Sequence, residues 1–339
     1  MIKNIGIIGE GKMGTNLLYY LLDMDFKLTW ICSQESDPEK LERTLNKRLT
    51  RTLEAGIIDE KRYRNIQDKI TISKRPEDLA DCDLIIEAIN EDIQAKQDLF
   101  QVLDSVASPD CIFASNSSSI NPSDLVPSEK RKDKFTGLHF FYPIALKNIV
   151  EVIKTPETSK ETIKKITSFL GTIHRNFLLL EEKDSFILNR IFLYFQNEAF
   201  LLTKEKKASI LQIDRIVKDH FFPIGVFEFF DNVGLDIMLS SIKNYSKYDP
   251  VPEQFHPLIL QIEEHVSNGR LGVKQNGGFY REGISDDPGK PENDTQIINK
   301  LMDSYKLAFN NLCNSSSITA KELKIAMDEY FGAETPSVK

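Results

Sequence analysis

The chain has 339 residues, of which 41% are hydrophobic and 28% are charged, so it is long enough for about two or three domains and too mixed in composition to be disordered. A formal net charge of -8 argues against a nucleic-acid partner, and the lack of a long apolar run argues against a membrane span. Four cysteines without C-x-x-C spacing, and an N-terminus that leads straight into a strand, favour a cytoplasmic protein with reduced thiols.

Short apolar runs alternate with helical patterns in the first half of the chain, which predicts a mostly parallel sheet covered by helices. Eight strands are expected, over residues 4–8, 28–32, 70–73, 84–88, 112–115, 135–138, 149–153 and 177–180. Leucines at helical spacing predict a helix over 13–24. The charged segment 38–68 predicts two helices with a turn around Gly56, projecting from the sheet as an insertion.

A glycine-rich turn, GEGKMG at residues 9–14, joins the first expected strand to the first expected helix. Gly9 permits the tight turn, Gly11 lets the backbone approach a pyrophosphate, and Gly14 lets the helix pack against the strand. The free N–H groups of the helix N-terminus favour phosphates. The turn therefore predicts a dinucleotide site that includes Gly9, Gly11, Lys12, Met13 and Gly14.

The second expected strand ends without the acidic residue that bonds the adenosine ribose of NAD in such sites. The chain reads CSQE at residues 32–35. Glu35 can bond the ribose if the loop turns inward. The alternative is a site for the 2′-phosphate of NADP, formed by Ser33 and Gln34 with Lys40 or Arg43. NAD and NADP both remain open at this point.

One histidine lies between a hydroxyl cluster and a carboxylate: residues 115–119 contain four serines, His139 follows them, and Glu151 comes after it. Imidazole has the side-chain pKa nearest neutrality, so it can exchange a proton with a hydroxyl group. Downstream of a dinucleotide turn, this arrangement predicts oxidation of an alcohol, with hydride passing to a nicotinamide and the proton to His139. The histidines at 174, 220, 256 and 265, and Trp30, have no such context and are predicted to be structural.

Helical patterns replace the strand signal after residue 184, with helices expected over 186–204 and 210–221. We expect a nucleotide-binding domain over 1–183 and a helical domain over 184–285. Residues 197–200, 209–210 and 220–221 recur in similar order at 306–309, 317–318 and 330–331. This weak repeat predicts a partial second helical unit over 295–332, after an exposed linker at 286–294 and before a loose tail at 334–339.

Several ordered segments together resemble the 3-hydroxyacyl-CoA dehydrogenase family of fatty-acid metabolism. They are the glycine turn and residues 83–88, 114–119, 137–143, 150–152, 186–190, 222–225, 231–236 and 277–280. The resemblance covers residues 3–280. It implies a Rossmann-type α/β domain followed by an all-helical domain, and it implies an enzyme that interconverts an L-3-hydroxyacyl-CoA and a 3-oxoacyl-CoA without a metal. The implied cofactor is NAD, with NADP as the alternative.

The same resemblance implies roles for individual residues. It makes His139 the acid/base, Glu151 its partner, and Ser118 and Asn189 the polar groups around the substrate oxygen. Ser118 is also expected to touch the nicotinamide. Glu91 and Lys96 match positions that face the cofactor in the family. Lys47, Arg48 and Arg51 occupy a segment that in the family helps to hold the nucleotide end of coenzyme A. Ser33 is a further cofactor candidate, on its own position at the end of the second expected strand.

Tyr142 departs from the family pattern, which usually has asparagine after the two phenylalanines of this motif. A side chain of that size near His139 is expected to change the shape of the acyl pocket and leaves the substrate open. The alternatives are a related dehydrogenase for a free hydroxy acid or a carrier-protein-bound acyl group, and a non-catalytic dinucleotide-binding protein. The resemblance also implies either a homodimer formed through the helical domain, or a monomer in which the C-terminal extension covers the dimer surface.

Overall fold

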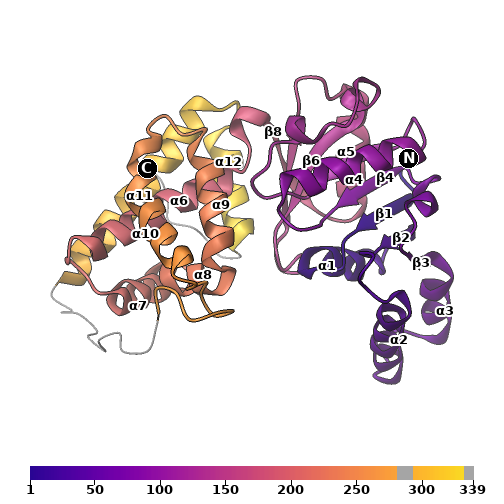
Figure 1. Ribbon diagram of the computed structural model, residues 1–339, viewed down its shortest axis with the longest axis horizontal. Coiled ribbons are helices and arrows are strands. Elements are labelled where there is room, and N and C mark those ends of the chain that lie inside the picture. The colour runs from indigo at the N-terminus through magenta and orange to yellow at the C-terminus, as the bar shows by residue number, and fades with distance from the viewer. Residues whose placement is uncertain (281–292, 332–339) are drawn as a thin grey trace. The chain divides into compact units, whose positions relative to one another are not determined.

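The computed structural model describes residues 1–280 and 293–331. The chain divides into two compact units, Met1–Ser185 and Phe186–Lys339, and each is taken by itself below (Figure 1). The expected tail and most of the expected linker lie outside the described residues. Asp294, which we expected in the linker, instead begins a helix.

The first unit is built on one eight-stranded sheet with the strand order β3-β2-β1-β4-β5-β6-β7-β8. The strands are β1 (Asn4–Ile8), β2 (Lys27–Ile31), β3 (Ile70–Ser73), β4 (Leu84–Glu87), β5 (Ile112–Ser115), β6 (Phe135–Phe140), β7 (Ile149–Lys154) and β8 (Asn176–Glu181). Every neighbouring pair is parallel except β6 with β7. The predicted mostly parallel α/β sheet is confirmed. Its strand order reverses between β1 and β4, where sheets of this kind bind nucleotides.

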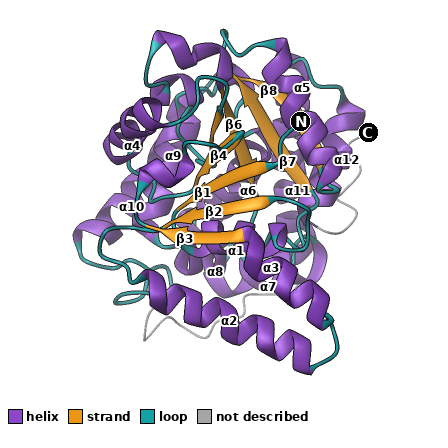
Figure 2. Ribbon diagram, turned by 90° about the vertical axis from the view of Figure 1, so that its right-hand side faces the viewer, coloured by secondary structure: helices purple, strands orange, loops and turns teal. Residues whose placement is uncertain are grey.

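Helices cover both faces of this sheet (Figure 2). α1 (Lys12–Leu21) and α5 (Lys160–Thr172) pack on one face, where Ile5 and Ile7 share an apolar core with Leu17. α4 (Ile93–Val106) packs on the other face, where Ile85 and Phe113 meet Phe100. Short 3-10 helices connect the strands at Pro76–Leu79, Pro122–Leu125, Glu129–Lys134 and Glu182–Asp184. This layering leaves the carboxyl ends of β1, β4, β5 and β6 along one edge.

The segment after β2 forms two helices, α2 (Pro38–Glu54) and α3 (Glu60–Lys69), beside the β3 edge of the sheet (Figure 1; Figure 2). Asp37 caps α2 by accepting a hydrogen bond from the Glu39 amide, and Pro38 begins the helix. The turn between the helices needs a positive φ of 69°, which Gly56 adopts without strain.

The described part of the second unit contains helices and no strand, so the expected helical fold is confirmed for these residues. The helices are α6 (Ile187–Lys204), α7 (Ile210–His220), α8 (Val226–Val233), α9 (Leu235–Ser246), α10 (His256–Ser267), α11 (Asp294–Ser315) and α12 (Ala320–Phe331), with a 3-10 turn at Pro252–Phe255. α11 packs along α6, and the Ser304 hydroxyl donates to the Tyr194 carbonyl at 2.8 Å. Phe331 of α12 stacks on Phe222, with ring centroids 4.0 Å apart.

Two element ends differ from the sequence expectations by two residues or more, and the others agree within one residue. β6 continues to Phe140 instead of ending at residue 138, because β7 pairs with it as far as the Phe140 and Val150 positions. His139 is therefore a strand residue. α1 ends at Leu21 instead of residue 24, because the chain turns there to enter β2 at Lys27. Among the described residues, no helix is both long and apolar enough to cross a membrane.

Candidate active site

The glycine turn after β1 leaves room for a phosphate group. Gly9 has a φ of 110°, and a Cβ there would lie 2.5 Å from the Ala88 carbonyl. A Cβ on Gly14 would lie 2.1 Å from the Gly9 carbonyl, so α1 can approach the turn only because this residue is glycine. A Cβ on Gly11 would meet nothing within 4 Å. The side of the turn at Gly11 is therefore open, and no side chain caps α1 there, as the pyrophosphate of a dinucleotide requires.

Trp30 of β2 holds this turn in place. Its indole Nε1 donates to the Gly9 carbonyl at 2.8 Å, and its side chain is almost wholly buried. The structural role predicted for Trp30 therefore includes a hydrogen bond that fixes the backbone of the dinucleotide turn. Beside it, Lys12 is exposed and Met13 half-buried in the first turn of α1.

A carboxylate lies at the end of β2, although the strand itself provides none. Glu10 of the glycine turn accepts hydrogen bonds from the Ser33 amide at 3.1 Å, from the Ser33 hydroxyl at 2.7 Å and from the Ser36 hydroxyl at 2.5 Å. Burial raises the pKa of Glu10, but these serine hydrogen bonds outweigh it and hold the pKa below its ordinary value. Sequence reasoning missed Glu10 because it treated the residue only as a spacer between glycines.

Of the groups expected to receive an NADP phosphate, Ser33, Gln34 and Arg43 are directed elsewhere, whereas Lys40 is exposed on α2. The Ser33 hydroxyl donates to Glu10, and the Gln34 amide donates to the Lys74 carbonyl at 3.2 Å. The Arg43 guanidinium pairs with the carboxylates of Asp37 and Glu39. Three of the four predicted phosphate groups are thus already engaged.

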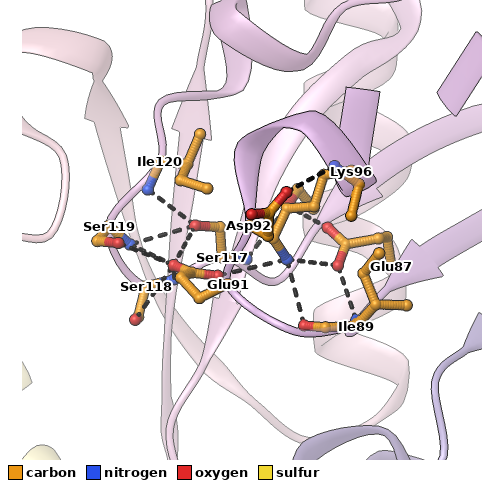
Figure 3. A network of polar contacts seen from close by, with 11 residues as sticks. Glu87, Ile89, Glu91, Asp92, Lys96, Ser117, Ser118, Ser119 and Ile120 are labelled. Atoms are coloured by element: carbon orange, nitrogen blue, oxygen red, sulfur yellow. Dashed lines mark hydrogen bonds and ion pairs between the residues drawn. The ribbon is translucent and has the colours of Figure 1, made fainter. Parts of the chain in front are cut away.

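A buried polar network joins the end of β4 to the serine cluster after β5 (Figure 3). Lys96 of α4, only 1% exposed, lies 2.5 Å from Glu87 and 3.3 Å from Glu91. Glu91 accepts hydrogen bonds from the Ser117 hydroxyl at 2.6 Å and from the Ser118 amide at 3.0 Å. Lys96 thus points at two carboxylates, and Glu91 is the member of the pair that fixes the backbone at Ser118.

The environment of Glu91 favours its ionised form. Burial raises the pKa of Glu91, but the charge of Lys96 and the hydrogen bonds from Ser117 and Ser119 outweigh it, so the pKa lies below its ordinary value. The conformation of the serine cluster therefore depends on a carboxylate that stays charged at neutral pH.

His139 and Glu151 form a buried pair across two antiparallel strands. They are opposite each other in the β6–β7 register, and the Nδ1 atom of His139 lies 2.7 Å from Oε2 of Glu151. The Glu151 side chain is 0% exposed and that of His139 is 6% exposed. Their neighbours Leu138 and Val152 belong to the core under α1 and α5, so the pair faces the opposite side of the sheet.

Ser118 belongs to the same edge of the sheet as this pair. β5 and β6 are adjacent, with Ser115 opposite Gly137, so Ser118 and His139 both come from the carboxyl ends of neighbouring strands. The Asn116 side chain accepts a hydrogen bond from the Phe140 amide at 2.9 Å and ties the two strand ends together. The first unit thus places Ser118 at the same edge of the sheet as the His139–Glu151 pair.

The remaining predicted site residues lie elsewhere in the chain. Asn189 is in α6 of the second unit, where its amide donates to the Tyr245 hydroxyl at 2.9 Å. Tyr142 directly follows β6 and Phe141, and is 54% exposed.

Three predicted coenzyme A residues are exposed on α2: Lys47, Arg48 and Arg51. The Arg48 guanidinium lies over the Tyr19 ring, 4.2 Å from its centroid. Lys47 and Arg51 are four residues apart and therefore share one face of the helix. These three residues lie on α2, which follows β2, whereas His139 lies in β6.

An open glycine turn at the reversal of a mostly parallel sheet, together with a buried histidine–carboxylate pair in the same sheet, is typical of a dinucleotide-dependent oxidoreductase. The family model described as 3-hydroxyacyl-CoA dehydrogenase, NAD binding domain, matches residues 4–183, and that of the family's C-terminal domain matches residues 186–282. The chain belongs to the 3-hydroxyacyl-CoA dehydrogenase family. NAD is its cofactor, and NAD-dependent oxidoreduction of hydroxyacyl-CoA is the activity that this membership assigns to it.

Individual relatives agree with this assignment. The mitochondrial hydroxyacyl-coenzyme A dehydrogenase of Rattus norvegicus is 31% identical over 290 residues, which are 83% of this chain and 91% of that protein. The 3-hydroxybutyryl-CoA dehydrogenase of Clostridioides difficile is 31% identical over 280 residues, 81% of this chain and 98% of that protein. The crystal structure of (S)-3-hydroxybutyryl-CoA dehydrogenase from Ralstonia eutropha matches with a TM-score of 0.73 and 28% identity, covering 84% of this chain and 100% of that one. The resemblance stated from the motifs is thus confirmed.

Proposed function

We propose that the chain interconverts an L-3-hydroxyacyl-CoA and a 3-oxoacyl-CoA, with His139 as the acid/base. The buried pair of His139 and Glu151 carries the proposal. NAD, held at the turn of Gly9, Gly11 and Gly14, would supply the acceptor for the hydride that leaves C3 of the substrate. His139 takes the hydroxyl proton in the same direction and returns it in the reverse reaction.

Glu151 orients the imidazole of His139 and stabilises its protonated form. A carboxylate 2.7 Å from Nδ1 favours the tautomer with hydrogen on that atom, which directs the lone pair of Nε2 toward the substrate. Once His139 is protonated, the negative charge of Glu151 stabilises the imidazolium. Glu151 is therefore a positioning residue in this proposal.

Ser118 and Asn189 are proposed to donate hydrogen bonds to the substrate oxygen, where negative charge develops during reduction. For Ser118, the support is its place beside His139 at the strand ends and its backbone bond to Glu91. For Asn189, the support is the family likeness of residues 186–190. Ser118 is also proposed to touch the nicotinamide.

The coenzyme A end of the substrate is assigned to α2. Lys47 and Arg51 are exposed and form no ion pair within the described residues, so their charges are available for phosphate groups. Arg48 is held against Tyr19 and remains exposed.

Tyr142 favours a second candidate, a dehydrogenase for a free hydroxy acid or a carrier-protein-bound hydroxyacyl group. Its large, exposed side chain follows the His139 strand and is proposed to narrow the acyl pocket. Family membership therefore does not specify the acyl chain length or the carrier, and an assay with different substrates distinguishes them.

The direct test follows NADH consumption with acetoacetyl-CoA and compares it with free acetoacetate. We expect turnover with the CoA ester. His139→Gln should abolish turnover and leave NADH binding intact, whereas the control His220→Gln, at an exposed position in the last turn of α7, should change neither. Turnover of the free acid alone would establish the second candidate, and NADH binding without turnover of any hydroxyacyl or oxoacyl compound would establish a non-catalytic protein.

Two further assignments complete the proposal. All four cysteines are free thiols, which supports a reducing compartment such as the cytoplasm. Helix α11 of the C-terminal extension packs along α6, which supports a monomer in which this extension covers the surface that a dimer would use.

A further inference from the structure

We propose that Glu10 of the glycine turn binds the adenosine ribose of NAD and selects NAD over NADP. In folds of this kind an acidic residue at the end of β2 has that task. This inference rests on the NAD site of the proposed function and assigns a residue within it.

The strand end offers no carboxylate of its own. Cys32 is buried, and its thiol donates to the Ser73 carbonyl at 3.5 Å, toward the β3 side of the sheet. Gln34 is bonded to the backbone of Lys74, and Glu35 is exposed in the following turn. None of these side chains is held where β2 meets the glycine turn.

Glu10 is held at that place by the register of the sheet. β1 and β2 pair in parallel up to Ile8 opposite Ile31. Glu10 and Ser33 each follow the last paired residue by two positions, so they reach the same level above the sheet. Gly9 and Gly11 on either side of Glu10 define the turn that receives the pyrophosphate, and the adenosine ribose is the group attached to that pyrophosphate.

The three serine hydrogen bonds fix the Glu10 carboxylate but do not occupy all of its acceptor positions. Oε1 accepts from the hydroxyls of Ser33 and Ser36, and Oε2 accepts from the Ser33 amide. A carboxylate has about four acceptor positions, two on each oxygen. Oε2 therefore keeps the capacity to accept a hydrogen bond from a ribose hydroxyl.

The charge of Glu10 provides the discrimination. Its lowered pKa keeps it ionised at neutral pH, so it accepts hydrogen bonds from the 2′ and 3′ hydroxyls of NAD and repels the 2′-phosphate of NADP. The charge of Arg43, a nearby cation that could offset this repulsion, is already balanced by the carboxylates of Asp37 and Glu39.

The fluorescence of Trp30 allows nucleotide binding to be measured without following turnover. It is the only tryptophan of the chain, and its indole donates to the Gly9 carbonyl of the same turn. Energy transfer from Trp30 to bound NADH or NADPH therefore measures both dissociation constants on the full-length protein. Glu10→Gln keeps the size of the side chain and removes its charge.

We expect Glu10→Gln to weaken NADH binding about 10- to 100-fold, the range for loss of hydrogen bonds to a charged group. NADPH binding should stay the same or tighten. The preference for NADH, given by the ratio of the two dissociation constants, should therefore fall by at least the same factor as NADH binding. Ser36→Ala removes one bond that orients Glu10 and should give a smaller loss of the same sign. Thermal unfolding and the Trp30 emission of each free variant verify folding.

An unchanged ratio of the two dissociation constants in folded Glu10→Gln overturns the inference. So does a loss of the NADH preference in Glu35→Gln with none in Glu10→Gln, because the ribose acid is then Glu35. Wild-type protein that binds neither nucleotide contradicts the proposed function itself, whereas NADH binding that Glu10→Gln does not weaken contradicts only the role of Glu10.

Discussion

At the scale of single residues, the acid/base pair depends on strand register. His139 and Glu151 are twelve positions apart in sequence, and they meet because β6 and β7 are antiparallel and pair these two residues directly. Side chains opposite each other on one face of such a pair lie close enough to interact. The rest of the pair's environment follows from the alternation of the strands, which sends Leu138 and Val152 into the core and keeps the polar pair on the other face.

Glu151→Gln tests whether this contact matters for catalysis. Glutamine keeps the shape of the side chain but cannot stabilise an imidazolium, and it permits the wrong tautomer of His139. We expect kcat to fall roughly 100- to 10,000-fold, the range for loss of acid–base function. NADH affinity, measured by energy transfer from Trp30, should not change. A kcat close to that of the wild type would show that His139 works without the carboxylate.

Glu91 predicts a pH dependence of stability. Its pKa is lower in the folded protein than its ordinary value, so the ionised form stabilises the fold. That stabilisation is present above the ordinary pKa and is lost as the pH falls through the folded value. Glu91→Gln should therefore lower the free energy of unfolding at pH 7, and its difference from the wild type should shrink toward about pH 3.

Urea unfolding at a series of pH values from 7 down to about 3, below the ordinary glutamate pKa, measures this difference. Glu39→Gln, at an exposed position in the first turn of α2, serves as the control and should show no comparable convergence. A difference for Glu91→Gln that grows on acidification would mean that the neutral carboxyl is the form that stabilises the fold.

Residues that act within a local pattern were predictable, and those that act through distant neighbours were not. The glycine turn was predicted because strand, turn and helix follow one another in sequence. Glu10 was missed because its partners, Ser33 and Ser36, reach it only through the pairing of β1 with β2. A carboxylate within the turn, followed by a strand that ends without one, was the available signal.

At the scale of elements, α2 and α3 show how much short-range signals can specify. Asp37 and Pro38 mark the start of α2, Gly56 marks the turn, and Asp59 caps α3 by accepting from the Arg62 amide at 2.7 Å. All of these are local in sequence. The end of β6 was not predictable in this way, because the strand continues only as far as its partner β7 supports it.

The exposed face of α2 predicts a specific effect on substrate binding. Replacing Lys47 and Arg51 together by alanine should raise the KM for acetoacetyl-CoA about tenfold, because two charge-assisted contacts to phosphate are lost. The KM for acetoacetyl-N-acetylcysteamine, which lacks the nucleotide, should not change. The effect should also diminish at high salt, since exposed charges are screened.

Arg64→Ala is the matched control for this pair. Arg64 is an exposed cation on α3 that is already paired with Glu60, so its removal should leave both KM values unchanged. An equal rise of KM for the truncated substrate would place the effect of Lys47 and Arg51 on the fold and not on coenzyme A.

At the scale of the whole molecule, two helices of the chain lie beyond the residues that the family models match. The matched residues end at 282, whereas α11 and α12 occupy 294–331. Residues 197–200 lie in α6 and their counterparts 306–309 lie in α11, so the weak repeat relates two helices that pack together. Whether this represents part of a second domain stays a prediction, because a repeat in sequence does not reveal which surface the second copy covers.

The packing of α11 predicts that the full chain is a monomer. The helix buries Leu301, Tyr305 and Phe309, each at most 3% exposed, and Ser304 anchors it to the backbone of α6. An apolar helix face that is already covered within one chain is not available to a second chain. Sedimentation of the full-length protein should therefore give a mass near 38.8 kDa over a wide concentration range.

A chain that ends at residue 285 should expose the covered face of α6 and form dimers or larger species. Because such a truncation also removes core contacts, Leu301→Asp in the full chain provides a second route: a buried charge is costly, so α11 should detach while the sequence stays complete. The exposed residue Leu307 of the same helix gives the control, and Leu307→Asp should remain a monomer. A full-length dimer that persists unchanged after truncation would show that the extension leaves the dimer surface open, and a dimer that dissociates on truncation would show that α11 and α12 build the contact.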